Sequence, residues 1–255
     1  MENLFDFNDC TALIAGGATG LGYEMTRGLL SAGCKVAIAG RTRNRVMSVA
    51  KDLSDNYNGK CYGFEADIST EDSINLLTEK VRDVFNGKLN IAINSAGINV
   101  RNPISKVSLI EWENIQKINL TGGFLFAKSL FPLLRGADFG RLINVTSIFS
   151  TRSFQDRISY SSSKGGLLQL TKTLAIEWAP YNITVNAISP GPFLTDLNKP
   201  VLDNPENYRN FCRNIPLNRF GEPAEIVTAC LFLASRFSSY VTGADIMVDG
   251  GWTAT

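Results

Sequence analysis

The sequence predicts an α/β protein built on a doubly wound parallel sheet with helices on both faces, and three observations support this fold class. Short apolar, β-prone runs alternate with longer helical patterns along the whole chain, as they do where helices connect parallel strands. The 255 residues are 44% apolar and 19% charged, which is the composition of a globular protein. No proline- or glycine-rich linker, internal repeat or low-complexity segment divides the chain. We therefore expect a single domain over residues 1–255.

Seven strands are expected in one sheet. Two helix starts carry the hydroxyl and carboxylate spacing of a capping box, at Ser69-Thr70-Glu71-Asp72 and at Ser108-Leu109-Ile110-Glu111. Gly33 stands where a glycine is expected after the first helix. The predicted strands are Thr11 to Ala15, Lys35 to Ala39, Cys61 to Glu65, Leu89 to Asn94, Arg141 to Thr146, Ile183 to Ser189 and Ala244 to Val248.

The composition excludes several function classes. There is no histidine, which excludes Ser-His-Asp and Cys-His catalysis and every metal site that uses imidazole. A net charge of +1 argues against a nucleic-acid binder. Five widely spaced cysteines form no Cys-x-x-Cys pair, and no secretory or membrane-spanning segment is recognisable. We expect no bound metal, no membrane partner and a cytoplasmic location.

A glycine-rich loop follows the first predicted strand. Gly16, Gly20 and Gly22 form the pattern G-x-x-x-G-x-G directly before a helical segment. Glycines at such a turn allow the backbone to approach a pyrophosphate, and the free N–H groups of the helix start attract its charge. A glycine-rich turn is also ordinary turn chemistry, so this loop alone does not decide between the two interpretations.

The second predicted strand ends at Gly40 and Arg41, where a dinucleotide fold commonly has an acidic residue for the adenosine ribose. No acidic residue is present. An arginine at this place suits a 2′-phosphate, so we expect Arg41 to favour NADP(H) over NAD(H). Arg45 is expected to lie in a solvated helix start, outside the site.

Tyr160 and Lys164 lie four residues apart in a helical pattern that runs to about Ala179, so they share a helix face. An ammonium beside a phenol favours the phenolate, and the pair could exchange protons without a histidine. Ser147 follows the strand that ends at Thr146, at the sheet edge where such proteins bind ligands. A tyrosine and a lysine four residues apart also occur by chance on exposed helix faces, so this pair alone does not establish a catalytic site.

Taken together, these motifs resemble a classical short-chain dehydrogenase/reductase over essentially the whole chain. The match adds Asp67-Ile68, Asn94-Ser95-Ala96-Gly97, Pro190-Gly191 and Thr195. The resemblance implies a Rossmann-type fold, a homotetramer, a cofactor half over about residues 1–150 and a catalytic and substrate half over about 140–255. It implies a catalytic set of Asn119, Ser147, Tyr160 and Lys164. The implied cofactor contacts are Gly16, Thr19, Gly20, Leu21, Gly22, Arg41, Asp67, Ile68, Asn94, Ala96, Gly97, Tyr160, Lys164, Pro190, Gly191 and Thr195.

Two positions depart from the family pattern. Ala15 stands where threonine is usual, and Ser95 replaces the second asparagine of Asn-Asn-Ala-Gly. Both concern the support of loops, so we expect altered stability or cofactor affinity and intact chemistry.

The expected function is NADP-dependent interconversion of a ketone and a secondary alcohol. Tyr160 would donate the proton in reduction, Ser147 would hold the carbonyl oxygen, and Lys164 would lower the pKa of Tyr160. By resemblance, Lys164 would also bind the nicotinamide ribose, and Asn119 would hold a water that passes protons to Lys164. An alternative of another class is a noncatalytic dinucleotide-binding sensor.

The segments expected to enclose the substrate are rich in polar residues, which suits a small hydroxylated or carboxylated ketone. Asn99, Arg101, Arg157 and Phe193 are the candidate contacts, with Arg101 as partner of a carboxylate. The passage around Arg101 resembles members that act on sugar acids, such as gluconate 5-dehydrogenases. A 3-oxoacyl thioester reductase is the alternative.

Overall fold

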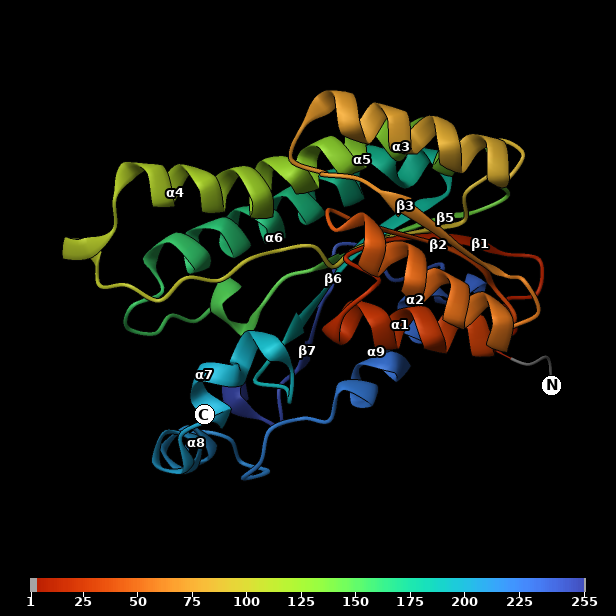
Figure 1. Cartoon of the computed structure of the whole chain (residues 1–255). Coiled ribbons are helices and arrows are strands. Elements are labelled where there is room, and N and C mark those ends of the chain that lie inside the picture. The colour runs from red at the N-terminus through yellow and green to blue at the C-terminus, as the bar shows by residue number, and fades with distance from the viewer. Residues whose placement is uncertain (1–3, 255) are drawn as a thin grey trace.

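The computed structural model describes residues 4–254 and contains a seven-stranded parallel sheet between two layers of helices (Figure 1). The spatial order is β3-β2-β1-β4-β5-β6-β7, so the order reverses between β1 and β4. This is the doubly wound topology that was predicted. The strands are β1 (Thr11–Ala15), β2 (Lys35–Gly40), β3 (Cys61–Glu65), β4 (Ile91–Asn94), β5 (Gly140–Val145), β6 (Ile183–Pro190) and β7 (Asp245–Val248).

Each predicted strand is present, and the differences are confined to strand ends. β4 begins two residues later than predicted, at Ile91, and the side-chain amide of Asn90 before it donates to Asp138 at 2.9 Å. β6 reaches Pro190, which is tolerated because the missing amide hydrogen falls at the strand end.

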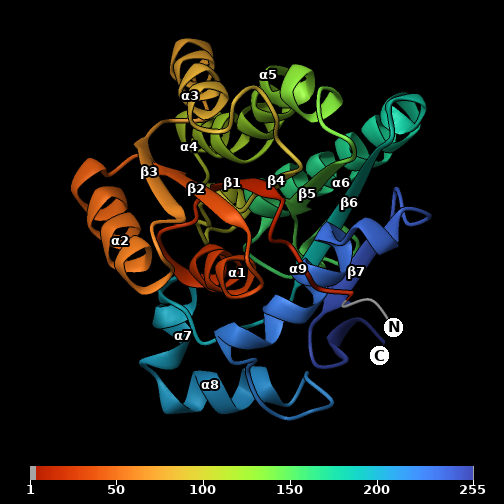
Figure 2. The ribbon, with the colours of Figure 1, turned by 90° about the vertical axis from the view of Figure 1, so that its right-hand side faces the viewer.

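The connections are helical, with short 3₁₀ turns between them. The helices are α1 (Gly20–Ser31), α2 (Arg43–Asn56), α3 (Glu71–Val84), α4 (Leu109–Gln116), α5 (Gly122–Arg135), α6 (Ile158–Trp178), α7 (Lys199–Leu202), α8 (Pro205–Cys212) and α9 (Val227–Ala234). α1, α2 and α9 cover one face of the sheet, while α3, α4, α5 and α6 lie on the other (Figures 1 and 2).

The two faces of the sheet form two separate apolar cores. Along β1, Ala12 and Ile14 belong to the core under α1, α2 and α9, whereas Leu13 and Ala15 belong to the core under α3 and α5. Alternation is expected because successive strand side chains point to opposite faces. All four side chains are buried, which explains why the strand is apolar throughout.

The two predicted capping boxes form only in part. Ser108 accepts a hydrogen bond from the backbone N–H of Glu111 at 3.1 Å, but the Glu111 carboxylate accepts from Asn102 instead of returning to the cap. The prediction at Ser69 is wrong, because α3 begins after Thr70 without a side-chain cap. Asp67 explains the difference, since its carboxylate accepts from both the N–H and the hydroxyl of Ser69.

α7 and α8 lie side by side outside both helical layers (Figures 1 and 2). They have a small apolar core of their own, formed by Val201, Cys212, Ile215 and Phe220. This arrangement places the segment after β6 over the sheet edge at which the parallel strands end. Within residues 4–254, no helix is long and apolar enough to cross a membrane.

Candidate active site

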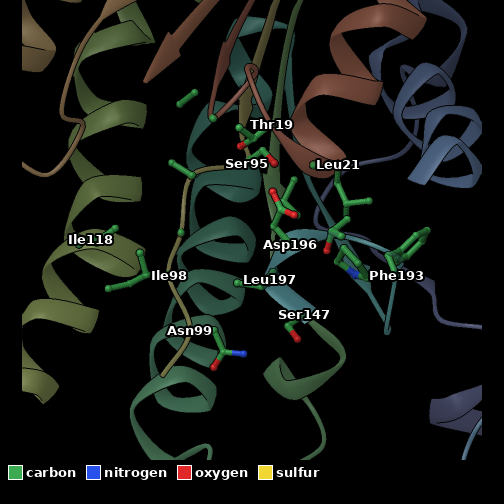
Figure 3. A pocket seen from close by; sticks show the side chains of 18 of the residues that line it. Thr19, Leu21, Ser95, Ile98, Asn99, Ile118, Ser147, Phe193, Asp196 and Leu197 are labelled. Carbon is green, nitrogen blue, oxygen red and sulfur yellow. The ribbon is translucent and has the colours of Figure 1, made fainter. Parts of the chain in front are cut away.

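A cavity of about 560 Å³ runs along the edge of the sheet where the strands end. Residues that follow β1, β2, β4, β5 and β6 converge on it, as Thr19, Ser95, Asn99, Ser147 and Phe193 do in Figure 3. Most of the predicted site residues line it. These are Gly16, Thr19, Gly20, Leu21, Arg41, Asp67, Ile68, Ala96, Gly97, Asn99, Arg101, Ser147, Arg157, Tyr160, Lys164, Pro190, Gly191, Phe193 and Thr195.

The glycine loop requires glycine for two different reasons. Gly16 and Gly20 have φ angles of +78° and +52°, in the left-handed region that glycine adopts without strain. Gly22 does not line the cavity, and its expected cofactor contact stays a prediction. A Cβ atom there would lie 2.2 Å from the carbonyl oxygen of Gly16, so Gly22 allows α1 to pack against the loop.

The end of β2 presents two arginines to the cavity. Arg41 lines it as predicted, and Arg45 lines it as well, which corrects the expectation that Arg45 lies outside the site. Arg45 lies in the first turn of α2, which begins at Arg43. Both side chains are exposed, and within residues 4–254 neither forms an ion pair.

Asp67 lies opposite this pair, at the start of the turn before α3. Burial raises the pKa of Asp67, but the hydrogen bonds from Ser69 and the positive charges of Arg41 and Lys117 outweigh it and leave the pKa below its usual value. Asp67 is therefore a carboxylate at neutral pH. It both forms the turn and lines the cavity.

Tyr160, Ser147 and Lys164 meet at the other end of the cavity, and all three are buried. The Ser147 side chain hydrogen-bonds to the phenol of Tyr160. The ammonium of Lys164 donates a 2.7 Å hydrogen bond to the carbonyl oxygen of Val145 and lies 5.9 Å from the centre of the Tyr160 ring. The structure thus brings together three residues that lie up to 17 positions apart.

The electrostatics of the pair differ from the expectation that Lys164 lowers the pKa of Tyr160. Burial raises the pKa of Tyr160, and the opposing effects come from the Ser147 hydrogen bond and the charge of Arg157. Burial also lowers the pKa of Lys164 to about 8. The two pKa values therefore move apart, because burial disfavours the charged form of each group: the phenolate of Tyr160 and the ammonium of Lys164.

Asn119 is fully buried beside the cavity, in a π-helical segment between α4 and α5. Its Nδ2 donates to the carbonyl oxygen of Ile98 and to the hydroxyl of Ser163, and its Oδ1 accepts from the N–H of Ile98. Both amide hydrogens are used, so the side chain holds the segment after β4 against α6. Its expected role in proton passage stays a prediction.

Asn94 also does not line the cavity, and its expected cofactor contact stays a prediction. It is buried in β4, and its Nδ2 lies beside Gly123 of α5, where a Cβ atom would be 3.1 Å away. Neither polar atom of its side chain has a hydrogen-bond partner.

The four predicted substrate residues surround the Tyr160 end of the cavity. Arg101 donates to Asn198 Oδ1 at 3.3 Å, and Asn99 has a buried Oδ1 without a partner. Arg157 and Phe193 are buried. Further lining residues escaped prediction because their place depends on the path of the chain after β5 and β6. They are Phe149, Asp196 and Leu197.

Comparison with known proteins gives the family. Residues 16–253 match the family described as Enoyl-(Acyl carrier protein) reductase. The chain belongs to the short-chain dehydrogenase/reductase family. It is 35% identical over 240 residues to the 3-oxoacyl-acyl-carrier-protein reductase FabG of Aquifex aeolicus, covering 94% of this chain and 96% of the relative.

Two further similarities concern proteins that act on sugar acids. The 2-dehydro-3-deoxy-D-gluconate 5-dehydrogenase of Formosa agariphila is 31% identical over 254 residues, with 99% of this chain and 96% of the relative covered. The structure of a gluconate 5-dehydrogenase from Burkholderia cenocepacia in complex with NADP and tartrate superposes with a TM-score of 0.94 at 28% identity, covering 99% and 98% of the two chains.

These similarities identify the short-chain dehydrogenase/reductase described here as an oxidoreductase that uses NAD or NADP. They do not support the alternative of a noncatalytic sensor. Among residues 4–254, no group of three His, Cys, Asp or Glu side chains is placed to hold a metal ion.

Proposed function

We propose that this enzyme interconverts a ketone and a secondary alcohol with NADP(H), and that Tyr160 is its acid/base. The observation that carries the proposal is one cavity with the glycine loop, Arg41 and Arg45 at one end and Ser147, Tyr160 and Lys164 at the other. Such a cavity can hold a dinucleotide along its length and present a carbonyl group to the phenol.

The residues of the first half of the cavity fit NADP(H). A Cβ atom on Gly16 would lie 2.9 Å from the carbonyl group of Ser95, so glycine keeps this part of the loop compact enough for a pyrophosphate. Arg41 and Arg45 would hold the 2′-phosphate, since both are cations without an ion-pair partner within residues 4–254. When bound, the nicotinamide supplies or accepts the hydride.

The chain's own residues would then handle the proton. The Ser147 hydroxyl would donate to the substrate oxygen beside the phenol, and Tyr160 would give that oxygen its proton in reduction or take it in oxidation. Lys164 would hold positive charge near the phenolate while Val145 fixes its position. Asn119 keeps Ile98 against this end of the cavity.

We propose a small polar keto sugar or sugar acid as substrate. Arginine and amide side chains around Tyr160 support it, because an apolar ligand would leave them unpaired. The gluconate 5-dehydrogenase with NADP and tartrate and the dehydrogenase of Formosa agariphila add support. The similarity to FabG favours a 3-oxoacyl thioester as the second candidate.

The test is NADPH consumption by the purified enzyme with 5-ketogluconate and related keto sugars beside acetoacetyl thioesters. We expect kcat/KM to be highest for a keto sugar or keto acid. A clear preference for the thioester would overturn the substrate proposal and leave the chemistry intact. Absence of turnover with every ketone would overturn the chemistry.

We further propose a homotetramer that acts in the cytoplasm, with cofactor and substrate halves over about residues 1–150 and 140–255. Large apolar side chains on α4, α5 and α6 are exposed, among them Ile110, Phe124 and Ile176, and a partner copy would cover them. The five cysteines are free and buried, which suits a reducing compartment. Light scattering on the purified enzyme tests the tetramer.

A further inference from the structure

Arg157 is a buried cation that no carboxylate of the described chain neutralises. It immediately precedes α6, and only 4% of its surface is exposed. Its Nε atom is buried without a hydrogen-bond partner, and its guanidinium lies 5.7 Å from the centre of the Phe149 ring. Within residues 4–254 it forms no ion pair.

A second buried arginine, Arg141, has a structural role and allows a comparison of hydrogen-bond partners. Arg141 is 1% exposed, and its guanidinium donates to the carbonyl oxygens of Gly140, Ser235 and Arg236 at 2.8 to 3.2 Å. These acceptors offset the desolvation of the charge. Among residues 4–254 no hydrogen-bond acceptor lies at the Nε atom of Arg157, so the described chain does not offset its desolvation in this way.

The charge on Arg157 persists at neutral pH. Burial, together with the nearby charge of Arg101, lowers its pKa to about 10, while Tyr160 and Asp156 act in the opposite sense. A buried, unpaired cation destabilises the folded protein unless an anion joins it. Arg101 is only half-buried and has an amide oxygen as its partner, so two positive charges face this region.

The position of Arg157 relates it to the reacting group. It lies three residues before Tyr160, which is one helical turn, and each of the two influences the titration of the other. Arg157, Arg101 and Phe211 line both the main cavity and an adjoining recess of about 380 Å³. The two arginines therefore stand where the recess meets the catalytic end of the cavity.

We propose that Arg157 is the main anchor of a carboxylate on the substrate, with Arg101 as the second cation, and that this pair selects keto and hydroxy acids over neutral ketones. The inference rests on the proposed function and specifies its substrate class. Amide side chains line the recess, and they would bind hydroxyl groups of the part of the substrate beyond the carboxylate. They are Gln155, Asn207, Asn210 and Asn214.

A different role for Arg157 would give different kinetics. If its charge served only to stabilise the phenolate of Tyr160, its loss would reduce kcat for every substrate and shift the pH profile. If Arg157 served only the fold, its loss would lower the free energy of unfolding, and kcat/KM would fall equally for all substrates. A carboxylate anchor affects KM, and it does so for anionic substrates alone.

The experiment compares Arg157→Gln and Arg157→Lys with the unaltered enzyme, using NADPH with 5-ketogluconate and with the neutral ketose L-sorbose. Arg152→Gln is the matched control, because Arg152 donates to the carbonyl oxygen of Thr253 and lines neither cavity. We expect Arg157→Gln to raise KM for 5-ketogluconate about 10- to 100-fold, the loss of one charged hydrogen bond. Any effect on kcat through Tyr160 applies to both ketones, so the ratio of kcat/KM for 5-ketogluconate to that for L-sorbose should fall by about the same 10- to 100-fold, and Arg157→Lys should be intermediate.

Equal losses for both ketones, or an unchanged KM for 5-ketogluconate, would overturn the proposal. Calorimetric titration of the NADP-loaded protein with tartrate and D-gluconate tests the carboxylate anchor independently of the proposed ketone reduction. Weaker binding of both anions to Arg157→Gln would support the anchor even if neither ketone is reduced. Failure of the unaltered protein to bind either anion would overturn the anchor, whatever ketone it reduces.

Discussion

Lys164 donates a 2.7 Å hydrogen bond from its ammonium to the carbonyl oxygen of Val145, the last residue of β5. The contact joins the second turn of α6 to the sheet edge, and within residues 4–254 this buried cation forms no ion pair. Gly97 makes room for this arrangement, since a Cβ atom there would lie 3.3 Å from the Lys164 ammonium. We expect the burial of this charge to lower the free energy of unfolding.

We expect the stability of the protein to depend on pH through Lys164. The pKa of Lys164 is about 8 in the folded chain, whereas its ordinary value, expected in the unfolded chain, is 10.5. Between pH 8 and pH 10.5 the unfolded chain therefore binds more protons than the folded chain. The free energy of unfolding therefore rises with pH across this window, by up to about 3 kcal/mol from this group.

Urea unfolding of the unaltered protein and of Lys164→Met at several pH values from 7 to 10.5 checks this expectation. The difference between the two unfolding free energies should move in favour of the unaltered protein as pH rises. Buried cysteines such as Cys61, with a pKa of about 12, act in the opposite direction, but they are present in both proteins and cancel. Parallel pH curves would show that Lys164 titrates normally.

Tyr160→Phe should abolish most turnover while the fold and the cofactor affinity are kept. The substitution removes the hydroxyl that carries the proton and leaves the ring, which packs edge-on against Phe149 with centroids 6.5 Å apart. The expected loss in kcat is about 10²- to 10⁴-fold, the usual contribution of a positioned acid or base. Near-normal turnover in a folded variant would refute the assignment.

The strands and the Tyr160 end of the cavity were predictable because they depend on local signals. Apolar runs bounded by turn residues locate the seven strands, and the four-residue spacing places Tyr160 and Lys164 on one face of α6. Parallel strands then bring Ser147 to the same edge as the glycine loop. None of these steps requires knowledge of side-chain contacts.

The remaining features depend on contacts between distant segments, which spacing does not encode. Arg45 lines the cavity only because α2 begins next to the end of β2, and Asn94 turns toward α5 because Gly123 leaves space there. Arg157 was predicted as a substrate contact, but its burial and the unpartnered Nε atom follow from the packing around α6 and Phe149. The pKa of Tyr160 likewise reflects burial, which the sequence does not show.

Arg41→Ala should weaken NADPH binding much more than NADH binding, since only NADPH carries the 2′-phosphate. A charged hydrogen bond contributes about 1.5 to 3 kcal/mol, which corresponds to roughly 10- to 100-fold in Kd. Arg45→Ala should show the same selectivity to a smaller extent, because Arg45 lines the same end of the cavity. Fluorescence titration of the unaltered enzyme and both variants with NADPH and with NADH measures the six dissociation constants. Equal losses for NADPH and NADH, or a preference of the unaltered enzyme for NADH, would contradict the role of Arg41.

The packing of the glycine loop against α1 gives the last prediction. A methyl group at Gly22 would lie 2.2 Å from the carbonyl oxygen of Gly16 and 3.2 Å from the Ser95 hydroxyl, and the loop backbone has little room to retreat. Gly22→Ala should therefore lower the free energy of unfolding by about 1 to 3 kcal/mol. The displaced loop should also weaken the binding of both NADPH and NADH. Gly165→Ala is the control, since its methyl group would meet only the Ser150 carbonyl oxygen, at 3.5 Å, and alanine favours a helix by up to about 1 kcal/mol. Thermal unfolding and cofactor titration of both variants decide the matter: a Gly22→Ala protein as stable as Gly165→Ala, with unaltered cofactor affinity, would mean that the close contact with Gly16 does not fix the loop.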